Sequence, residues 1–138
     1  IANELESRGA EFASWIHPTV IESRFHSIGR GCVIGPNSVI SCDVTIGDFA
    51  IINLGVTVGH DAIIGEGCTI NSHCDITGHV RIGRGTLLGS SVSIIPHVTV
   101  GEFATIGAGS TVVRRVRDHS TVMGNTAKRI TWGNNEAA

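Results

Sequence analysis

The sequence predicts an all-β fold, a parallel β-helix that winds in triangular coils, and three observations lead to this prediction. Every sixth residue from Ile28 to Val112 is Ile, Val or Leu, without a gap or an insertion. The residue two places before each of these aliphatic residues is small or β-branched, apart from His26. The chain of 138 residues has 18 glycines, few aromatic residues and no tyrosine, which fits a narrow interior.

Each hexad is expected to form a short strand with two inward side chains, followed by a tight corner. The corner residue, three places after the aliphatic one, is Gly, Asn, Asp or His in eleven of the fifteen hexads. These residue types best tolerate positive φ. Such units satisfy their backbone hydrogen bonds by stacking each hexad on the coil beneath it. With three hexads to a coil, residues 28–117 are expected to form about five coils.

Both flanks of the repeat lack its period. Residues 1–27 are interpreted as an N-terminal lead-in, with a short helical end over residues 2–8 that stops at Gly9 and an extended segment enforced by Pro18. Residues 118–138 are interpreted as an irregular C-terminal tail. Five of the ten basic residues lie within 114–129, against one acid, Asp118. This stretch is either a solvated tail or a site for a polyanionic ligand.

Charge and composition argue against several classes of protein. The formal net charge is −2 and 16% of the residues are charged, so we expect no basic surface for nucleic acid. We also expect no membrane span and no signal peptide, because no run approaches the ~18 apolar residues that a span needs. The four cysteines have no C-x-x-C pair and no zinc spacing, which favours reduced thiols and a cytoplasmic location.

His60 is the histidine that the repeat does not explain. His73, His79 and His97 occupy corner positions, where the backbone tolerates histidine, and are interpreted as structural; His79 and His97 lie one coil apart, which leaves a metal or phosphate contact open. His60 lies one place before a corner, where the backbone does not ask for imidazole. Asp61 fits the corner column by itself, and it could also orient the His60 ring and stabilise its protonated form.

The repeat resembles the left-handed β-helix acyltransferases of the hexapeptide-repeat superfamily, and the left-handedness is inferred from this resemblance. Within that superfamily the chain looks like the sugar acetyltransferases related to sialic-acid O-acetyltransferase and bacillosamine N-acetyltransferase. The segment Val-Gly-His60-Asp61 matches the general base and acidic partner of this branch. The segment Ile-His-Pro18 resembles one that follows an N-terminal nucleotide-sugar-binding domain in this branch. Two interpretations stay open: residues 1–27 include a remnant of such a domain, or the chain is a stand-alone catalytic coil.

The same resemblance implies the other site residues. Asn53 matches a substrate-contacting asparagine, and Gly78 matches the glycine whose N–H faces the thioester oxygen. Lys128 ends Gly-Asn-Thr-Ala-Lys128, which looks like the family's Gly-Asn-Pro-Ala-Lys segment beside coenzyme A. Three further residues are implied in cofactor binding: Thr69, where some relatives have a second histidine, and Ser90 and Ala108, which match backbone contacts to the pantetheine arm. No metal is implied.

The resemblance therefore implies an enzyme that transfers an acetyl group from acetyl-CoA to an amine or hydroxyl of a sugar or nucleotide-linked sugar. His60 would take the acceptor's proton during direct attack on the thioester, and the Gly78 N–H would stabilise the oxyanion. A homotrimer is also implied, with active sites in the clefts between neighbouring coils.

Three alternatives are weighed against this function. A non-catalytic β-helix assembly module stays open, and acetyl-CoA binding would discriminate between the two. An acetyltransferase for serine or another small molecule usually carries a long inserted loop, whereas no insertion interrupts the fifteen hexads. A γ-class zinc carbonic anhydrase needs three histidine ligands, including a pair five residues apart, and the sequence has no such pair.

Overall fold

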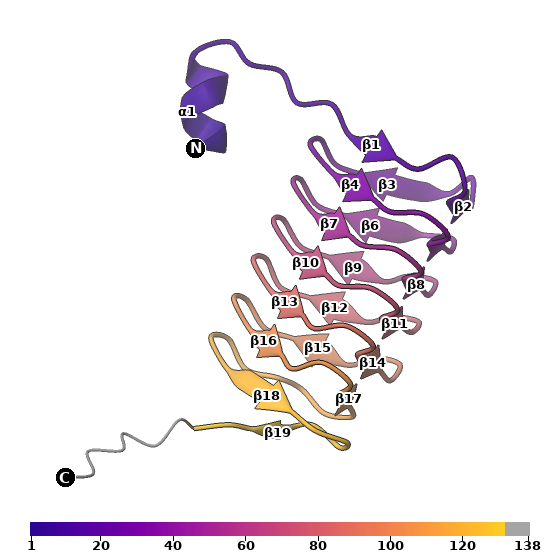
Figure 1. The fold of residues 1–138 in the computed structure, drawn as a ribbon, viewed down its shortest axis with the longest axis vertical. Coiled ribbons are helices and arrows are strands. Elements are labelled where there is room, and N and C mark those ends of the chain that lie inside the picture. Colours follow the sequence, from indigo (N-terminus) through magenta and orange to yellow (C-terminus); the bar gives the residue numbers. More distant parts are fainter. Residues whose placement is uncertain (132–138) are drawn as a thin grey trace, which may run out of the picture.

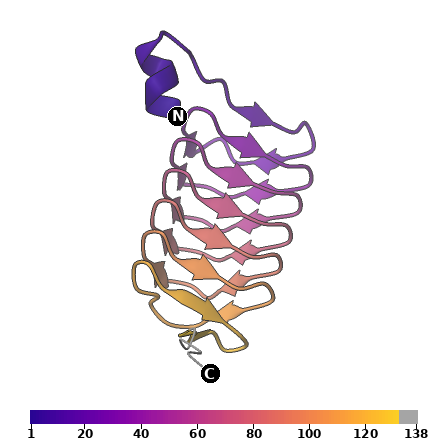
Figure 2. The ribbon, with the colours of Figure 1, turned by 60° about the vertical axis from the view of Figure 1, so that its left-hand side comes forward.

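The computed structural model describes residues 1–131 and shows a three-sided prism of stacked coils (Figures 1 and 2). Each side of the prism is a sheet, here called sheets A, B and C. In spatial order, sheet A contains β1 (Trp15–Ile16), β4 (Val33–Ile34), β7 (Ile51–Ile52), β10 (Thr69–Ile70), β13 (Leu87–Leu88), β16 (Thr105–Ile106), β18 (Thr121–Met123) and β19 (Lys128–Arg129). Sheet B contains β2 (Ile21–Glu22), β5 (Val39–Ile40), β8 (Thr57–Val58), β11 (Asp75–Ile76), β14 (Ser93–Ile94) and β17 (Thr111–Val112). Sheet C contains β3 (His26–Ile28), β6 (Val44–Ile46), β9 (Ile63–Ile64), β12 (Arg81–Ile82) and β15 (Thr99–Val100).

The strand register confirms the predicted coil. Neighbouring strands within a sheet are parallel, apart from β18 and β19, and each paired strand residue from Trp15 to Ile94 lies opposite the residue three hexads further along, as Thr69 does with Leu87. The all-β, left-handed β-helix is therefore as expected. Within residues 1–131, α1 (Ala2–Ser7) is the only α-helix, and no helix there is long and apolar enough to cross a membrane.

The number of turns differs from the expected one: the prism has about six turns rather than five. At the start, Trp15 pairs with Val33 and Ile21 pairs with Val39, so an additional coil precedes Ile28. Its inward register position is taken by Glu22, and this charged residue interrupts the aliphatic column.

At the other end, the sheet pairing outlasts the six-residue period. Thr105 pairs with Thr121, which is two residues earlier than an 18-residue coil would require. The shortened coil no longer follows the six-residue pattern, but its strand still pairs with the coil before it, so β18 extends sheet A. The chain then turns back, and β19 pairs with β18 in the antiparallel direction. The stretch 118–131, expected to be irregular, thus contains two strands, while residues 132–138 of the predicted tail lie outside the described part.

The interior consists of the two inward columns that the sequence predicts. The aliphatic column from Ile34 to Val112 and the small column from Cys32 to Ser110 are buried throughout. Buried hydroxyl groups in the small column donate to backbone carbonyls, as Thr86 Oγ1 does to Gly101 O at 2.7 Å. Polar side chains therefore fit the core without unsatisfied groups.

The corners also match their predicted conformation. Fourteen of the fifteen corner residues have positive φ, with Arg115 as the exception. Even Phe49 (φ 57°) and Phe103 (φ 49°) adopt it, although large side chains rarely do. Stacking on the coil therefore imposes the corner geometry whatever the residue type.

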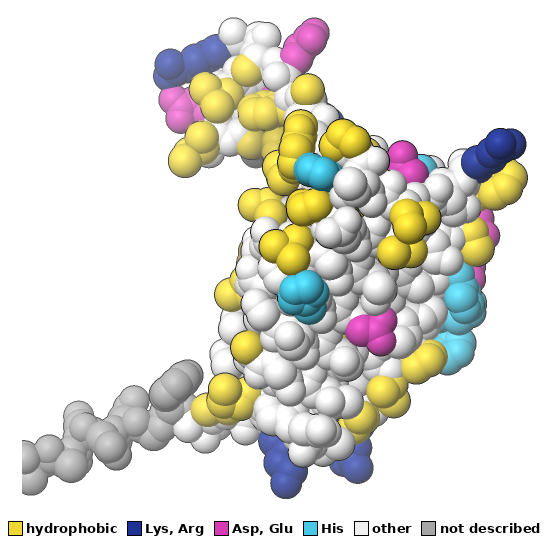
Figure 3. Space-filling model, turned by 45° about the vertical axis from the view of Figure 1, so that its right-hand side comes forward, with side chains coloured by type: hydrophobic (Ala, Val, Ile, Leu, Met, Phe, Trp, Pro, Cys, Tyr) yellow, Lys and Arg dark blue, Asp and Glu magenta, His cyan; other side chains and the backbone are white. Residues whose placement is uncertain are grey.

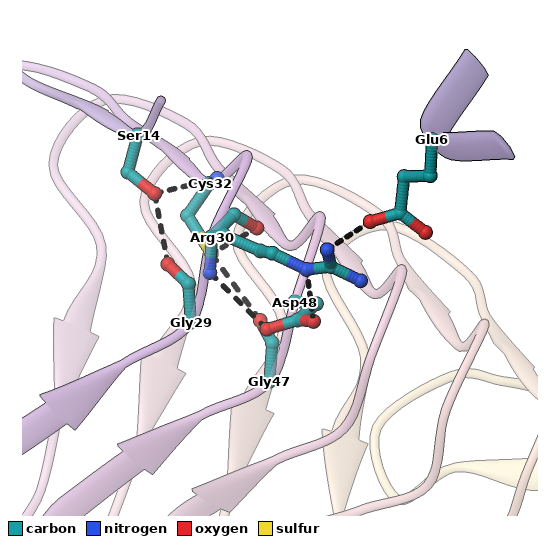
Figure 4. Close-up of polar contacts among 7 residues, drawn as sticks. All are labelled: Glu6, Ser14, Gly29, Arg30, Cys32, Gly47 and Asp48. Atoms are coloured by element: carbon teal, nitrogen blue, oxygen red, sulfur yellow. Dashed lines mark hydrogen bonds and ion pairs between the residues drawn. The ribbon is translucent and has the colours of Figure 1, made fainter. Parts of the chain in front are cut away.

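The N-terminal segment is attached to the prism by a small polar cluster (Figure 4). Ser14 Oγ accepts a hydrogen bond from Cys32 N at 3.0 Å. The Arg30 guanidinium pairs with Glu6 of α1 and, through Nε, with Asp48 Oδ2 at 2.9 Å. Arg30 thus links the helix to two successive coils.

We expect Asp48→Asn to lower the melting temperature slightly at neutral pH, and the difference to vanish in acid. The hydrogen bonds from Arg30 hold the pKa of Asp48 below 3.8. Because the folded-state pKa is the lower one, the carboxylate stabilises the fold above about pH 4 and loses this effect as the pH falls through the folded value. Thermal unfolding of both proteins, followed by circular dichroism at pH 7 and near pH 2, measures this. A difference that persists in acid would contradict the assignment.

Candidate active site

His60 and Asp61 lie at the edge where sheet B turns into sheet C, here called the B/C edge. They follow β8 directly, and His60 Nδ1 lies 2.8 Å from Asp61 Oδ2. An ionised carboxylate can only accept a hydrogen bond, so Nδ1 carries the proton and Nε2 keeps the free lone pair of a neutral imidazole. This hydrogen bond is the main cause that lowers the pKa of Asp61, and the nearby imidazoles of His79 and His60 contribute to the lowering. Asp61 is therefore ionised at neutral pH, and the expected contact between the two side chains is present.

Gly78 lies beneath the His60 ring, one coil further along the same edge. A β-carbon built on Gly78 would lie 2.7 Å from His60 Nε2, closer than real contacts allow. The two coils are joined here by a hydrogen bond from His79 N to His60 O at 2.9 Å. The hydrogen bonds between the described residues leave the Gly78 N–H without an acceptor. His60 Nε2 and the Gly78 N–H are thus neighbours at this edge.

A row of imidazoles continues from His60 along the B/C edge. The rings of His60 and His79 meet edge to face, with centroids 5.0 Å apart, and His79 stacks on His97 at 4.6 Å. His79 Nε2 lies 3.8 Å from Asp61 Oδ2. Figure 3 shows histidine side chains (cyan) gathered along one border of the molecule.

Beside this row, the surface has a hollow of about 410 Å³ that runs across several coils. It is lined by Asp43, Thr45, Asp61, Ile63, His79, Arg81, His97 and Thr99. The sequence reasoning missed Asp43 and Arg81. The signal for Asp43 was its 18-residue spacing from Asp61, which superposes the two corner residues.

The other expected site residues do not join His60 within one chain. Asn53 begins the edge between sheets A and B (the A/B edge), and β8 separates it from His60; its amide donates to Asn71 Oδ1 at 3.1 Å. Ser90 and Ala108 lie on the same A/B edge, at the two coils that follow β13 and β16. Two more expected site residues lie elsewhere: Thr69 in β10 of sheet A and Lys128 in β19.

The basic residues near the C-terminus gather around a second hollow, of about 330 Å³, at the end of the prism. Figure 3 shows Lys and Arg side chains (dark blue) projecting from this end. These basic side chains are all exposed, so both alternatives raised for this stretch, a solvated tail and a polyanion site, stay open. The hollow is lined by Arg114, Arg115, Arg117, Lys128 and Arg129, together with Val112, Val116, Ser120, Val122 and Ala127.

Two family models match the repeat in separate stretches. The model of the bacterial transferase hexapeptide (six repeats) matches residues 79–114, and that of the hexapeptide repeat of succinyl-transferase matches residues 26–60. Together they cover more than half of the chain. This chain belongs to the hexapeptide-repeat transferase family. A search of curated protein sequences gives no match.

Several solved structures are similar to this chain over most of its length. A variant of perosamine N-acetyltransferase from Caulobacter crescentus, in complex with CoA and GDP-perosamine, is 32% identical with a TM-score of 0.93, over 94% of this chain and 62% of that one. The acetyltransferase domain of PglB from Neisseria gonorrhoeae, in complex with acetyl coenzyme A, is 29% identical with a TM-score of 0.91, over 94% and 63%. The chain thus spans less than two thirds of these structures.

The serine-type alternative has a weaker structural counterpart. Soybean serine acetyltransferase, as the apoenzyme, is 30% identical, but its TM-score is 0.56, over 83% of this chain and 42% of that one. The hexapeptide-repeat chain is therefore more similar in structure to the two bacterial proteins, one of them a sugar N-acetyltransferase by name.

Proposed function

We propose that this hexapeptide-repeat protein transfers an acetyl group from acetyl-CoA to an amine or hydroxyl of a sugar or nucleotide-linked sugar. The observation that carries the proposal is the placement of His60 Nε2 over Gly78, with Asp61 bound to the opposite ring nitrogen. The similarity to a perosamine N-acetyltransferase that holds CoA and GDP-perosamine supports the donor and the acceptor class.

The reaction follows from the atoms at the B/C edge. His60 Nε2 accepts the acceptor's N–H or O–H proton while the acceptor nitrogen or oxygen attacks the thioester carbonyl. Asp61 holds the Nδ1–H tautomer and stabilises the imidazolium that forms. The Gly78 N–H donates to the oxyanion. When the intermediate collapses, the C–S bond breaks, and the coenzyme A thiolate takes the proton from His60.

A covalent acetyl-cysteine is not needed in this mechanism. Cys68 and Cys74 belong to the inward small column, and burial raises the pKa of both thiols. Each thiol donates to a backbone carbonyl, at 3.1 Å in both cases. They are therefore packing residues rather than nucleophiles, and reduced thiols fit the cytoplasmic location that we propose.

The decisive experiment incubates the protein with acetyl-CoA and a panel of nucleotide-linked sugars that differ in having an amine or only hydroxyl groups. Product is measured by mass spectrometry and release of free CoA. We expect transfer to at least one member of the panel, and its identity separates N- from O-acetylation. Binding of acetyl-CoA without transfer to any acceptor would favour the alternative, a non-catalytic assembly module.

We propose further that the protein acts as a homotrimer. Asn53, Ser90 and Ala108 lie on a different edge from His60, so a second chain is needed to bring an A/B edge to a B/C edge. Sheet A also offers exposed apolar side chains for contact, Trp15, Ile51 and Leu87 among them. Light scattering is expected to give three times the 14.5 kDa of one chain. A monomer that is active in the panel assay would contradict this assembly.

Lys128→Ala is expected to raise the KM for acetyl-CoA about tenfold, with a smaller effect on kcat, because the basic hollow would hold the phosphates of coenzyme A. Steady-state kinetics with acetyl-CoA as the varied substrate measures both constants. Arg24→Ala is the matched control, since it removes an exposed cation at the opposite end of the prism. An equal rise of KM in both variants would contradict a specific role for the hollow.

A further inference from the structure

Two imidazoles and a carboxylate converge at one point of the B/C edge. The ligand atoms are His60 Nδ1, Asp61 Oδ2 and His79 Nε2, and all three lie within 4.8 Å of one another. The carboxylate oxygen is 2.8 Å from the first nitrogen and 3.8 Å from the second. All three side chains are about half exposed, so an ion reaches them from solvent.

These separations suit a tetrahedral metal ion. Bonds of about 2.0–2.1 Å to Zn²⁺ place neighbouring ligand atoms about 3.3 Å apart. The observed 2.8 and 3.8 Å lie on either side of this value, so small rotations of the exposed side chains bring the ligands into place. His97 stacks on the His79 ring with an interplanar angle of 7° and so holds its plane.

The donor set selects the kind of ion. Imidazole nitrogens suit zinc, cobalt, nickel and copper, whereas magnesium and calcium prefer a shell made of oxygen atoms. The hollow beside the cluster, which Asp61 and His79 also line, leaves the remaining coordination position open to water.

We propose that His60, Asp61 and His79 form a site for a divalent transition-metal ion, Zn²⁺ or an ion of the same class, and that occupation of this site silences acetyl transfer. The metal takes the place of the proton on His60 Nδ1, and the neutral ring then carries its proton on Nε2. Nε2 is the atom over Gly78 that must accept the acceptor's proton. The metal-bound histidine therefore cannot act as a base. Asp61, now bound to the metal, also no longer accepts a hydrogen bond from His60 Nδ1.

Metal binding does not depend on the proposed function, whereas the inhibition of acetyl transfer rests on that function. Binding is therefore measured first, without substrates, by titrating the metal-free protein with Co²⁺ and following the visible absorption of the bound ion. We expect one Co²⁺ per chain, displaced by Zn²⁺ but not by Mg²⁺. His79→Asn is expected to weaken Co²⁺ binding about tenfold or more, since loss of even an outer-shell partner costs that much.

His119→Asn is the matched control, because His119 and His79 both have positive φ, which asparagine tolerates, and His119 stacks on Phe103, away from the B/C edge. We expect this control variant to bind Co²⁺ with an affinity close to that of the wild-type protein. Equal Co²⁺ affinity in the wild-type protein and His79→Asn, or no absorption band, would overturn the site.

The second measurement is acetyl transfer at increasing Zn²⁺ concentration. We expect inhibition of the wild-type protein and His119→Asn that EDTA reverses, and an inhibitory concentration about tenfold higher for His79→Asn. Co²⁺ binding with undiminished transfer would overturn the silencing. Should the protein transfer no acetyl group to any acceptor, the proposed function fails, while the Co²⁺ titration still decides whether the metal site exists.

Discussion

Replacing His60 with alanine is expected to lower kcat about 10²–10⁴-fold, because the reaction then lacks the base that accepts the proton of the attacking group. The melting temperature is expected to change little, since the side chain is about half exposed and lies outside the core. Release of free CoA in the presence of the acceptor found in the panel gives kcat, and circular dichroism gives the melting temperature.

The control for this variant is His119→Asn. His119 also has positive φ, 54°, which asparagine tolerates, and it stacks on Phe103 on the edge between sheets C and A. Its removal is expected to leave kcat within about twofold of the wild-type value, as for a surface residue away from the site. Wild-type turnover by His60→Ala would exclude this histidine as the base.

Gly78→Ala is expected to reduce kcat about 10²-fold, the effect of displacing a catalytic group by roughly 1 Å. The added β-carbon would meet His60 Nε2 at 2.7 Å, and the exposed His60 ring is the group that can yield. Because Gly78 does not have positive φ, alanine strains no backbone there. The stability of the fold is therefore expected to stay nearly constant while the activity falls.

The matched control is Gly67→Asn, on the edge between sheets C and A. A β-carbon at Gly67 meets nothing within 4 Å, and asparagine tolerates its φ of 64°. This variant is expected to keep both stability and kcat. If Gly78→Ala kept full activity, the base would not lie over the glycine during catalysis.

The sequence predicted the repeat, its inward columns and its corners because each depends on residues six or 18 apart. The predicted number of five coils is one too low, because the sequence pattern is lost where an aliphatic residue is replaced or where the spacing changes. Glu22 stands in the aliphatic column without breaking the strand pairing, and the last coil is two residues shorter, as Thr105 and Thr121 show. Backbone hydrogen bonds between the strands persist despite both changes. The six-residue pattern of side chains is interrupted by them, so the sequence does not reveal these additional strands.

The candidate site was predictable where it lies on one edge. The pair His60–Asp61 and its relation to Gly78 follow from adjacency and the 18-residue coil. The convergence of His79 on Asp61 did not follow, because it depends on side-chain torsions that the spacing leaves free. The separation of Asn53 from His60 was also not predicted. The two residues are only seven positions apart in sequence, but this length of chain crosses one whole side of the prism.

Because the coils between His60 and the basic hollow have a constant length, distances along the prism axis are multiples of one strand spacing. From β8 beside His60 to β17 beside the basic hollow there are three steps in sheet B, through β11 and β14. At about 4.8 Å per step this is about 14 Å. Loss or gain of one whole coil would change this distance in a single increment without disturbing the register. If the proposed site binds acetyl-CoA as inferred above, the distance between the reacting thioester and the phosphates of coenzyme A is set by the number of coils rather than by any side chain.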